Sequence, residues 1–138
     1  MLLSVKEICN LTGVTRKTLF HYDQIGLLEP TKRKGKQKVK LYDRTALIRL
    51  LEIRLYRFIG ISIDEIRIIL DGTDENRKHL FEKYLDVIND ERTVLEEKKK
   101  LVCILKDLEK DELSEILGSS GSMPQFKSII LDHYHEED

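Results

Sequence analysis

The first apolar pattern in the chain has helical spacing and begins directly after Ser4. The sequence Ser4-Val5-Lys6-Glu7 has the spacing of a capping box, in which the serine hydroxyl and the glutamate carboxylate bond the free N–H groups of a helix start. Gly13 supplies the positive φ that commonly ends a helix. We therefore expect a helix between these two signals. Its apolar face would consist of Val5, Ile8, Cys9 and Leu11.

A second helix is expected from about Arg16 to Ile25, because Thr15 can act as its N-cap and Gly26 follows its end. Leu19 and Ile25 are predicted to face inward. The tight turn between the two helices is typical of a helix-turn-helix, whose second helix lies in a DNA groove. An ordinary helical corner with solvated basic residues would have the same turn and caps. The residues offered to DNA would be Thr15, Arg16, Lys17, Thr18, His21 and Tyr22.

A small β-hairpin is predicted next. Residues 27–31 form a short apolar stretch closed by proline, and Val39-Lys40-Leu41-Tyr42 alternates apolar and polar residues. Between them lies the loop Lys32-Arg33-Lys34-Gly35-Lys36-Gln37-Lys38, whose cations repel one another unless they are solvated or matched to phosphates. Beside a helix-turn-helix this loop is typical of a DNA-binding wing, and elsewhere it would be a solvated loop.

Two further helices complete the expected first domain, residues 1–72. Asp43 is the predicted N-cap of a helix from about Arg44 to Ile59, which Gly60 ends. A second capping box, Ser62-Ile63-Asp64-Glu65, opens a fourth helix that stops at Asp71-Gly72. The third helix is expected to cover the first two with Leu47, Leu50, Leu51, Ile53, Leu55 and Phe58.

A long helix is predicted after this domain, because neither proline nor glycine occurs in residues 74–117. Unbroken, it would be more than about 60 Å long and could not bury itself. Arg92 and Lys99 fall on its apolar seam, where polar residues cost stability but fix register. We expect residues 73–117 to form a self-pairing coiled coil, with a partner protein as the alternative second strand. The seam consists of Phe81, Leu85, Ile88, Leu95, Val102 and Leu105.

The last segment, residues 118–138, is expected to be a Gly- and Ser-rich linker followed by one short amphipathic helix. This helix is too short to enclose a core, so its apolar face would have to pack on another part of the protein. His133 and His135 have the spacing of a weak metal pair, but histidines at a helix end are more common, and we predict no metal site. The candidate effector residues are Phe126, Ile130 and Tyr134.

Charge divides the chain into a basic front half and an acidic back half. Residues 1–60 carry 13 Lys and Arg against 5 Asp and Glu, whereas residues 61–138 carry 11 against 20. The net charge of -1 conceals this division. We therefore expect the front half to bind a polyanion.

Several classes of function find no support in the sequence. It contains no Gly-rich phosphate loop, no nucleophile and base pattern and no clustered acid pair, so we predict neither an enzyme nor a cofactor. Cys9 and Cys103 lack a CxxC partner, which argues against a disulfide or zinc site. No apolar run approaches the roughly 20 residues that cross a bilayer, and a cytoplasmic protein without a membrane partner is expected.

These features together resemble the MerR family of bacterial transcription regulators. The resemblance rests on Thr12-Gly13-Val14-Thr15, on residues 18–28, on Leu41-Tyr42 and on Gly60-Ile61-Ser62-Ile63-Asp64-Glu65-Ile66. It implies a mainly α fold with a winged helix-turn-helix, a long antiparallel dimerisation helix and a variable C-terminal effector region. It also implies a homodimer that distorts promoter DNA so that RNA polymerase can use it.

The family usually has Arg-Tyr-Tyr-Asp where this chain has Phe20-His21-Tyr22-Asp23, so one basic phosphate contact is missing. We infer that this chain relies more on its wing cations. A coiled-coil interaction module and an architectural DNA-bending protein remain the alternatives, and no residue pattern identifies a signal. The assignment to DNA binding covers Thr15, Arg16, Lys17, Thr18, His21, Tyr22, Lys32, Arg33, Lys34, Lys36, Lys38, Lys40, Tyr42 and Arg57.

Overall fold

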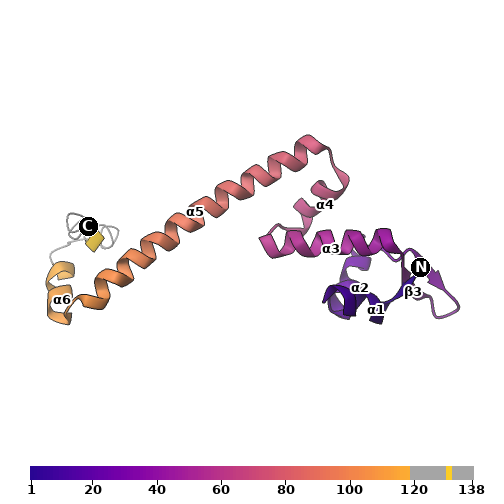
Figure 1. Cartoon of the computed structure of the whole chain (residues 1–138), viewed down its shortest axis with the longest axis horizontal. Helices are drawn as coiled ribbons and strands as arrows, with labels where there is room; N and C mark the ends of the chain where they lie inside the picture. The colour runs from indigo at the N-terminus through magenta and orange to yellow at the C-terminus, as the bar shows by residue number, and fades with distance from the viewer. Residues whose placement is uncertain (119–129, 132–138) are drawn as a thin grey trace. The chain divides into compact units, whose positions relative to one another are not determined.

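The computed structural model describes residues 1–118 and 130–131. It is mainly helical, with one small sheet, as predicted (Figure 1). The chain divides into two compact units, Met1–Glu82 and Lys83–Asp138. The elements in chain order are β1 (Leu3–Ser4), α1 (Val5–Thr12), α2 (Arg16–Gln24), β2 (Lys32–Lys34), β3 (Val39–Tyr42), α3 (Arg44–Ile59), α4 (Ile63–Asp71), α5 (Asp74–Asp107) and α6 (Lys110–Gly118).

The capping box at the start of α1 is confirmed. Ser4 N donates to Glu7 Oε1 and Glu7 N donates to Ser4 Oγ, each over 3.1 Å. Gly13 ends the helix at φ 74°, a conformation that side chains rarely adopt. The guanidinium of Arg54 occupies the space where a Cβ on Gly13 would lie. Glycine is therefore required at this turn both by backbone conformation and by packing.

Helix α2 is also confirmed, with Thr15 as its N-cap and Gly26 just beyond its end at φ 71°. Leu19 is fully buried, but Ile25 is only half-buried, and the second core side chain of the helix is Tyr22. The prediction that Leu19 faces inward is confirmed. Ile25 is less buried than predicted, because it is the C-cap, where the chain leaves helical geometry.

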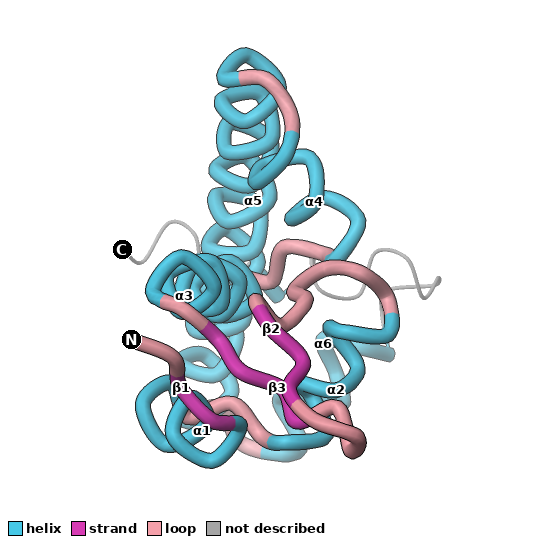
Figure 2. Tube along the Cα trace, turned by 90° about the vertical axis from the view of Figure 1, so that its right-hand side faces the viewer, coloured by secondary structure: helices cyan, strands magenta, loops and turns pink. Residues whose placement is uncertain are grey.

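The sheet has three antiparallel strands in the order β1-β3-β2 (Figure 2). The predicted hairpin exists, but its first strand is β2, inside the basic run, rather than residues 27–31. Leu27 and Leu28 instead form a turn after α2, in which both their N–H groups donate to Tyr22 O, at 2.9 and 3.2 Å. Both side chains are buried. The pairing of Leu3 with Tyr42 in β1 was not predicted.

Helix α3 has the predicted bounds, with Asp43 accepting a hydrogen bond from Ala46 N over 2.9 Å. Its buried side differs from the prediction. Leu51, Leu55 and Phe58 are 45%, 59% and 90% exposed, because each lies off the stripe that faces α1. The buried stripe, with spacings of four, three and three residues, consists of Ala46, Leu50, Ile53 and Tyr56.

Helix α4 begins at the predicted Ser62 cap, and two arginines bind the backbone that follows α2. Arg49 of α3 donates from Nε to Leu27 O over 2.9 Å and binds both carboxylate oxygens of Asp71, at the end of α4, over 3.0 and 3.1 Å. Arg67 of α4 donates to Ile25 O. These bonds fix the C-terminal end of α2 against α3 and α4.

The predicted unbroken helix over residues 74–117 is wrong, since α5 ends at Asp107 and α6 begins at Lys110. At the break Leu108 N bonds to Leu105 O over 3.3 Å, which is the tighter turn found at helix ends. Asp111 and Glu112 then occupy the first turn of α6, where negative charge is favourable. Half-buried apolar residues of the second unit include Leu101 and Ile104 of α5, Leu108 at the break, and Leu113 and Ile116 of α6.

The predicted coiled-coil seam stands largely exposed on the single chain. Leu85, Leu95 and Val102 are 60%, 64% and 64% exposed, and Ile88 and Leu105 are 44% and 40% exposed. Phe81 is half-buried instead, because its ring lies 5.9 Å from the ring of Tyr56 within the first unit. In the described part of the chain, no helix is both long and apolar enough to span a membrane.

Candidate nucleic-acid interface

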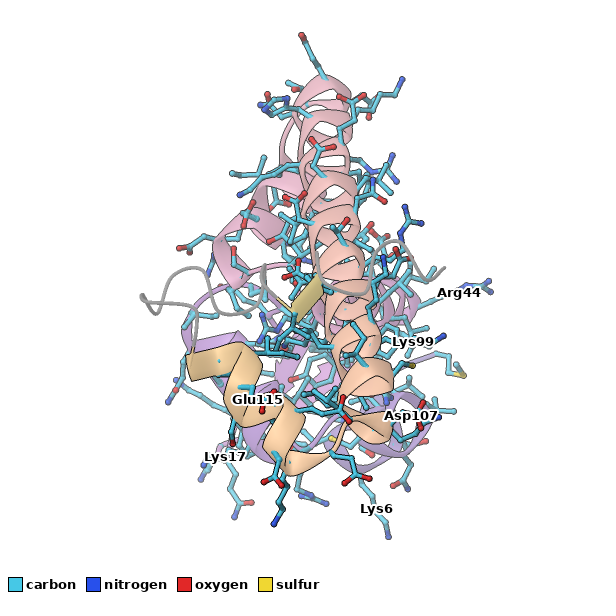
Figure 3. The ribbon with its side chains drawn as sticks, turned by 90° about the vertical axis from the view of Figure 1, so that its left-hand side faces the viewer. Lys6, Lys17, Arg44, Lys99, Asp107 and Glu115 are labelled. Atoms are coloured by element: carbon cyan, nitrogen blue, oxygen red, sulfur yellow. The ribbon has the colours of Figure 1, made fainter. Side chains whose placement is uncertain are left out.

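The first turn of α2 contains two cationic side chains and no acidic one. Arg16 and Lys17 are exposed there, and the side chain of Lys17 projects away from the ribbon (Figure 3). A helix N-terminus carries partial positive charge, so cations at this position are unfavourable for the isolated helix. A bound phosphate would be attracted both by these cations and by the helix N-terminus, and would offset the repulsion between them.

The polar side chains of α2 differ in their exposure and in the hydrogen bonds that they already make within the protein. Thr15 Oγ1 accepts from Thr18 N over 3.1 Å and donates to Thr18 Oγ1 over 2.9 Å, so its hydroxyl is used by the cap. His21 is exposed, whereas Tyr22 is 7% exposed and packs mainly in the core. Tyr22 therefore offers little surface to an interface.

The turn between β2 and β3 presents the wing cations. Gly35 and Lys38 have φ values of 77° and 52°, and Lys38 N bonds to Gly35 O over 3.2 Å. Lys38 is therefore in the left-handed region, which residues other than glycine rarely adopt. Lys32, Lys34, Lys36 and Lys38 are all exposed.

Asp23 on α2 holds the wing against the helix. Arg33 of β2 and Lys40 of β3 each place a side-chain nitrogen 2.7 Å from one of its carboxylate oxygens. The Lys40 ammonium also lies 4.4 Å from the centre of the Phe20 ring, a cation–π contact. The Asp23 side chain is only 9% exposed. This group of three residues, which we call the Asp23 clamp, joins α2 to the predicted wing.

The Asp23 clamp changes the roles of Arg33 and Lys40. Both are predicted to bind DNA, yet each forms an ion pair with Asp23, whose single negative charge offsets one of their two positive charges. The hydrogen bond from Arg33, reinforced by Lys40, holds the pKa of the Asp23 carboxyl below its ordinary value of 3.8. We infer that these two residues position the wing, and that Lys32, Lys34, Lys36 and Lys38 are the cations left for phosphates.

The structure contradicts one other assignment, Tyr42, and gives a second role to Arg57. Tyr42 is 0% exposed, so it cannot touch DNA; its hydroxyl has no hydrogen-bond partner among the described residues, and burial raises its pKa to about 12. Arg57 is exposed, but its guanidinium donates to Ile61 O over 2.9 Å at the turn between α3 and α4. Tyr42 therefore belongs to the core, whereas Arg57 holds a turn and its contact with DNA stays a prediction.

Acid is expected to release the Asp23 clamp. A carboxyl whose pKa is lowered by folding stabilises the protein fully above its unfolded value, near 3.8, and loses this contribution as the pH falls through the folded value. Asp43 and Asp71 have pKa values shifted in the same direction, by their bonds to Ala46 N and to Arg49. The urea midpoint should therefore decline below about pH 4 through these three groups.

The control for this prediction is Asp23→Asn, which should weaken the acid dependence because its side chain does not titrate. Nuclear magnetic resonance of the β2 and β3 amides across the pH range would report the wing directly. Wing signals that stay unchanged down to pH 2 would show that the Asp23 clamp does not hold the wing.

The predicted effector residues and the two C-terminal histidines lie mostly outside the described part of the chain. Ile130 is 4% exposed, whereas Phe126 and Tyr134 lie outside the described residues, as do His133 and His135. No group of three or more His, Cys, Asp or Glu side chains is placed to hold a metal ion in residues 1–118 and 130–131. Cys9 is half-buried and Cys103 is exposed, both as free thiols.

Comparison with known proteins gives the family. A model of the MerR HTH family regulatory proteins matches residues 3–73, about half of the chain. The HTH-type transcriptional activator TipA of Streptomyces coelicolor is 40% identical over 81 residues, 58% of this chain and 32% of that protein. The chain spans about a third of the length of the curated relatives it matches.

Solved structures share the fold. MtaN, the N-terminus of the Bacillus subtilis multidrug transporter activator, aligns with a TM-score of 0.66 and 27% identity over 77% of this chain and 99% of its own. HiNmlR, a MerR family regulator lacking the sensor domain and bound to promoter DNA, aligns with a TM-score of 0.55 and 23% identity over 91% and 96%. As its helix-turn-helix, basic wing and following long helix predicted, this chain belongs to the MerR HTH family of regulatory proteins.

Proposed function

We propose that this protein is a homodimeric, sequence-specific DNA-binding transcription regulator that acts on promoter DNA in the cytoplasm and not as an enzyme. The observation that carries this proposal is the joint surface of α2 and the wing: cations at the start of α2, exposed lysines in the wing, and the Asp23 clamp between them. Such a surface offers base-reading side chains and phosphate contacts in one fixed geometry.

The similar proteins support the same function. TipA is a transcriptional activator, and HiNmlR was solved on promoter DNA. We extend from them the distortion of a promoter for use by RNA polymerase. The exposed seam of α5 supports a homodimer, for which we propose antiparallel coils. Phe126, Ile130 and Tyr134 remain our candidates for a region that responds to a signal.

Selection from a random duplex DNA library tests this function. The purified protein should enrich a sequence with two-fold symmetry, because a dimer reads two half-sites. The selected duplex and a scrambled duplex would then be titrated at two salt concentrations. A protein that enriches no sequence and binds neither duplex is not a DNA-binding regulator, and a coiled-coil adaptor becomes the better reading.

Neutralising the wing should weaken binding to both duplexes. For Lys34→Ala with Lys36→Ala, the slope of log affinity against log salt should fall by roughly 0.9 for each phosphate contact that is lost. Lys78→Ala with Lys110→Ala removes the same charge from exposed positions of α5 and α6 and should leave the slope unchanged. Equal slopes in the two variants would show that the wing does not contact phosphates.

A further inference from the structure

We propose that a groove between the start of α1, α2 and the wing binds one sugar-phosphate strand of duplex DNA, and that Lys6 is a DNA-binding residue. This inference rests on the proposed function and names the part of DNA that this surface takes. The groove has a volume of about 460 Å³ and lies wholly within the first unit. It is lined by Ser4, Val5, Lys6, Arg16, Phe20, Gln37, Lys38, Val39 and Lys40.

The charge of the groove selects a polyanion. Four of its lining residues are cations and none is an acid. Lys40 is matched by Asp23, but no ion pair engages Lys6, Arg16 or Lys38 within residues 1–118 and 130–131. Three unmatched cations on one groove attract a chain of phosphates, whose spacing along a strand allows successive contacts.

Helix geometry adds to this attraction. Lys6 lies in the first turn of α1 and Arg16 in the first turn of α2, so two helix N-termini border the same groove. Partial positive charge at such ends favours phosphate. The first turn of α2 holds no acid that would offset Arg16, whereas Glu7 follows Lys6 in the first turn of α1. The helix contribution is therefore larger at Arg16 than at Lys6.

The apolar lining of the groove suits deoxyribose. It consists of Val5, Phe20 and Val39. Phe20 is 40% exposed and Val39 is 51% exposed, which leaves apolar surface for a sugar. A groove lined by both apolar residues and cations matches the alternation of sugar and phosphate along one strand, whereas base edges would require fixed donors and acceptors.

The test measures the salt dependence of Lys6→Ala in the full-length protein. Lys6 is exposed, and its side chain points away from the ribbon (Figure 3), so alanine should preserve the fold, which thermal unfolding would verify. The salt slope should fall by about one unit on a random duplex and on the selected duplex alike. Lys38→Gly should do the same, since glycine accepts the positive φ of that position.

The control and the strand assignment complete the experiment. Lys78→Ala, an equal charge change on exposed α5, should leave the slope unchanged. Single neutral methylphosphonates along the selected duplex should weaken the wild type at one backbone position to which Lys6→Ala is insensitive. If the wild type binds DNA and Lys6→Ala keeps its slope, the groove proposal is wrong while the function stands. If the wild type binds no DNA, both are wrong.

Discussion

Leu85→Asp combined with Leu95→Asp is expected to convert the protein into a monomer and to lower its affinity for the selected duplex by roughly 100- to 10,000-fold, the usual range of a lost second binding site. Both leucines are more than half exposed on α5, although they occupy the apolar seam. A second copy would cover them. Aspartate would instead place an uncompensated charge in that interface.

The matched control is Asn89→Asp with Thr93→Asp. Both residues are exposed on the same helix off the seam, and the control adds the same two negative charges. It should remain a dimer in sedimentation and keep its affinity within a few-fold. Intact protein that sediments as a monomer at micromolar concentration would contradict the dimer, and so would a seam variant that stays dimeric.

Local signals in the sequence were sufficient to locate the helix starts of the first unit. Ser4, Thr15, Asp43 and Ser62 each cap the helix predicted for them. Capping is chemistry between a side chain and backbone N–H groups two or three residues away, so it can be recognised without knowledge of the rest of the fold. The same holds for Gly13 at the end of α1, because its positive φ is a backbone conformation that glycine adopts far more readily than other residues.

Features that depend on distant contacts were not predictable in this way. The strand Lys32–Lys34 has a composition that disfavours β structure, and it forms because β3 offers it a partner. Leu108, at the break between α5 and α6, has no proline or glycine beside it to signal the turn. Leu55 and Phe58 were placed inward because apolar residues cover most of α3, and only packing shows which side is covered.

The Asp23 clamp is the clearest case of a group of residues that the sequence does not bring together. Asp23 was noted only as part of a family motif, and Arg33 and Lys40 were counted with the DNA-binding cations. The three residues come from α2, β2 and β3, and no periodicity relates them. Asp23 lies nine residues before Lys32, and Glu29 is closer to the basic run, so no local signal in the sequence indicates this pairing.

Asp23→Ala is expected to separate affinity from specificity. The change releases Arg33 and Lys40 and raises the net charge by one, so binding to a scrambled duplex should not weaken. Binding to the selected duplex should weaken, because the wing and α2 no longer hold a fixed angle. The ratio of the two affinities should fall on the order of tenfold, comparable to the loss of one good base contact.

Asp86→Ala is the matched control, since it removes an exposed acid of α5 and raises the net charge equally. It should keep the affinity ratio of the wild type. Arg33→Ala should lower the ratio as Asp23→Ala does, although it changes the charge in the opposite direction, because the Asp23 clamp loses a partner in either variant. If Arg33→Ala instead weakens both duplexes equally and Asp23→Ala leaves the ratio intact, Arg33 is a phosphate contact and the wing is held by other bonds.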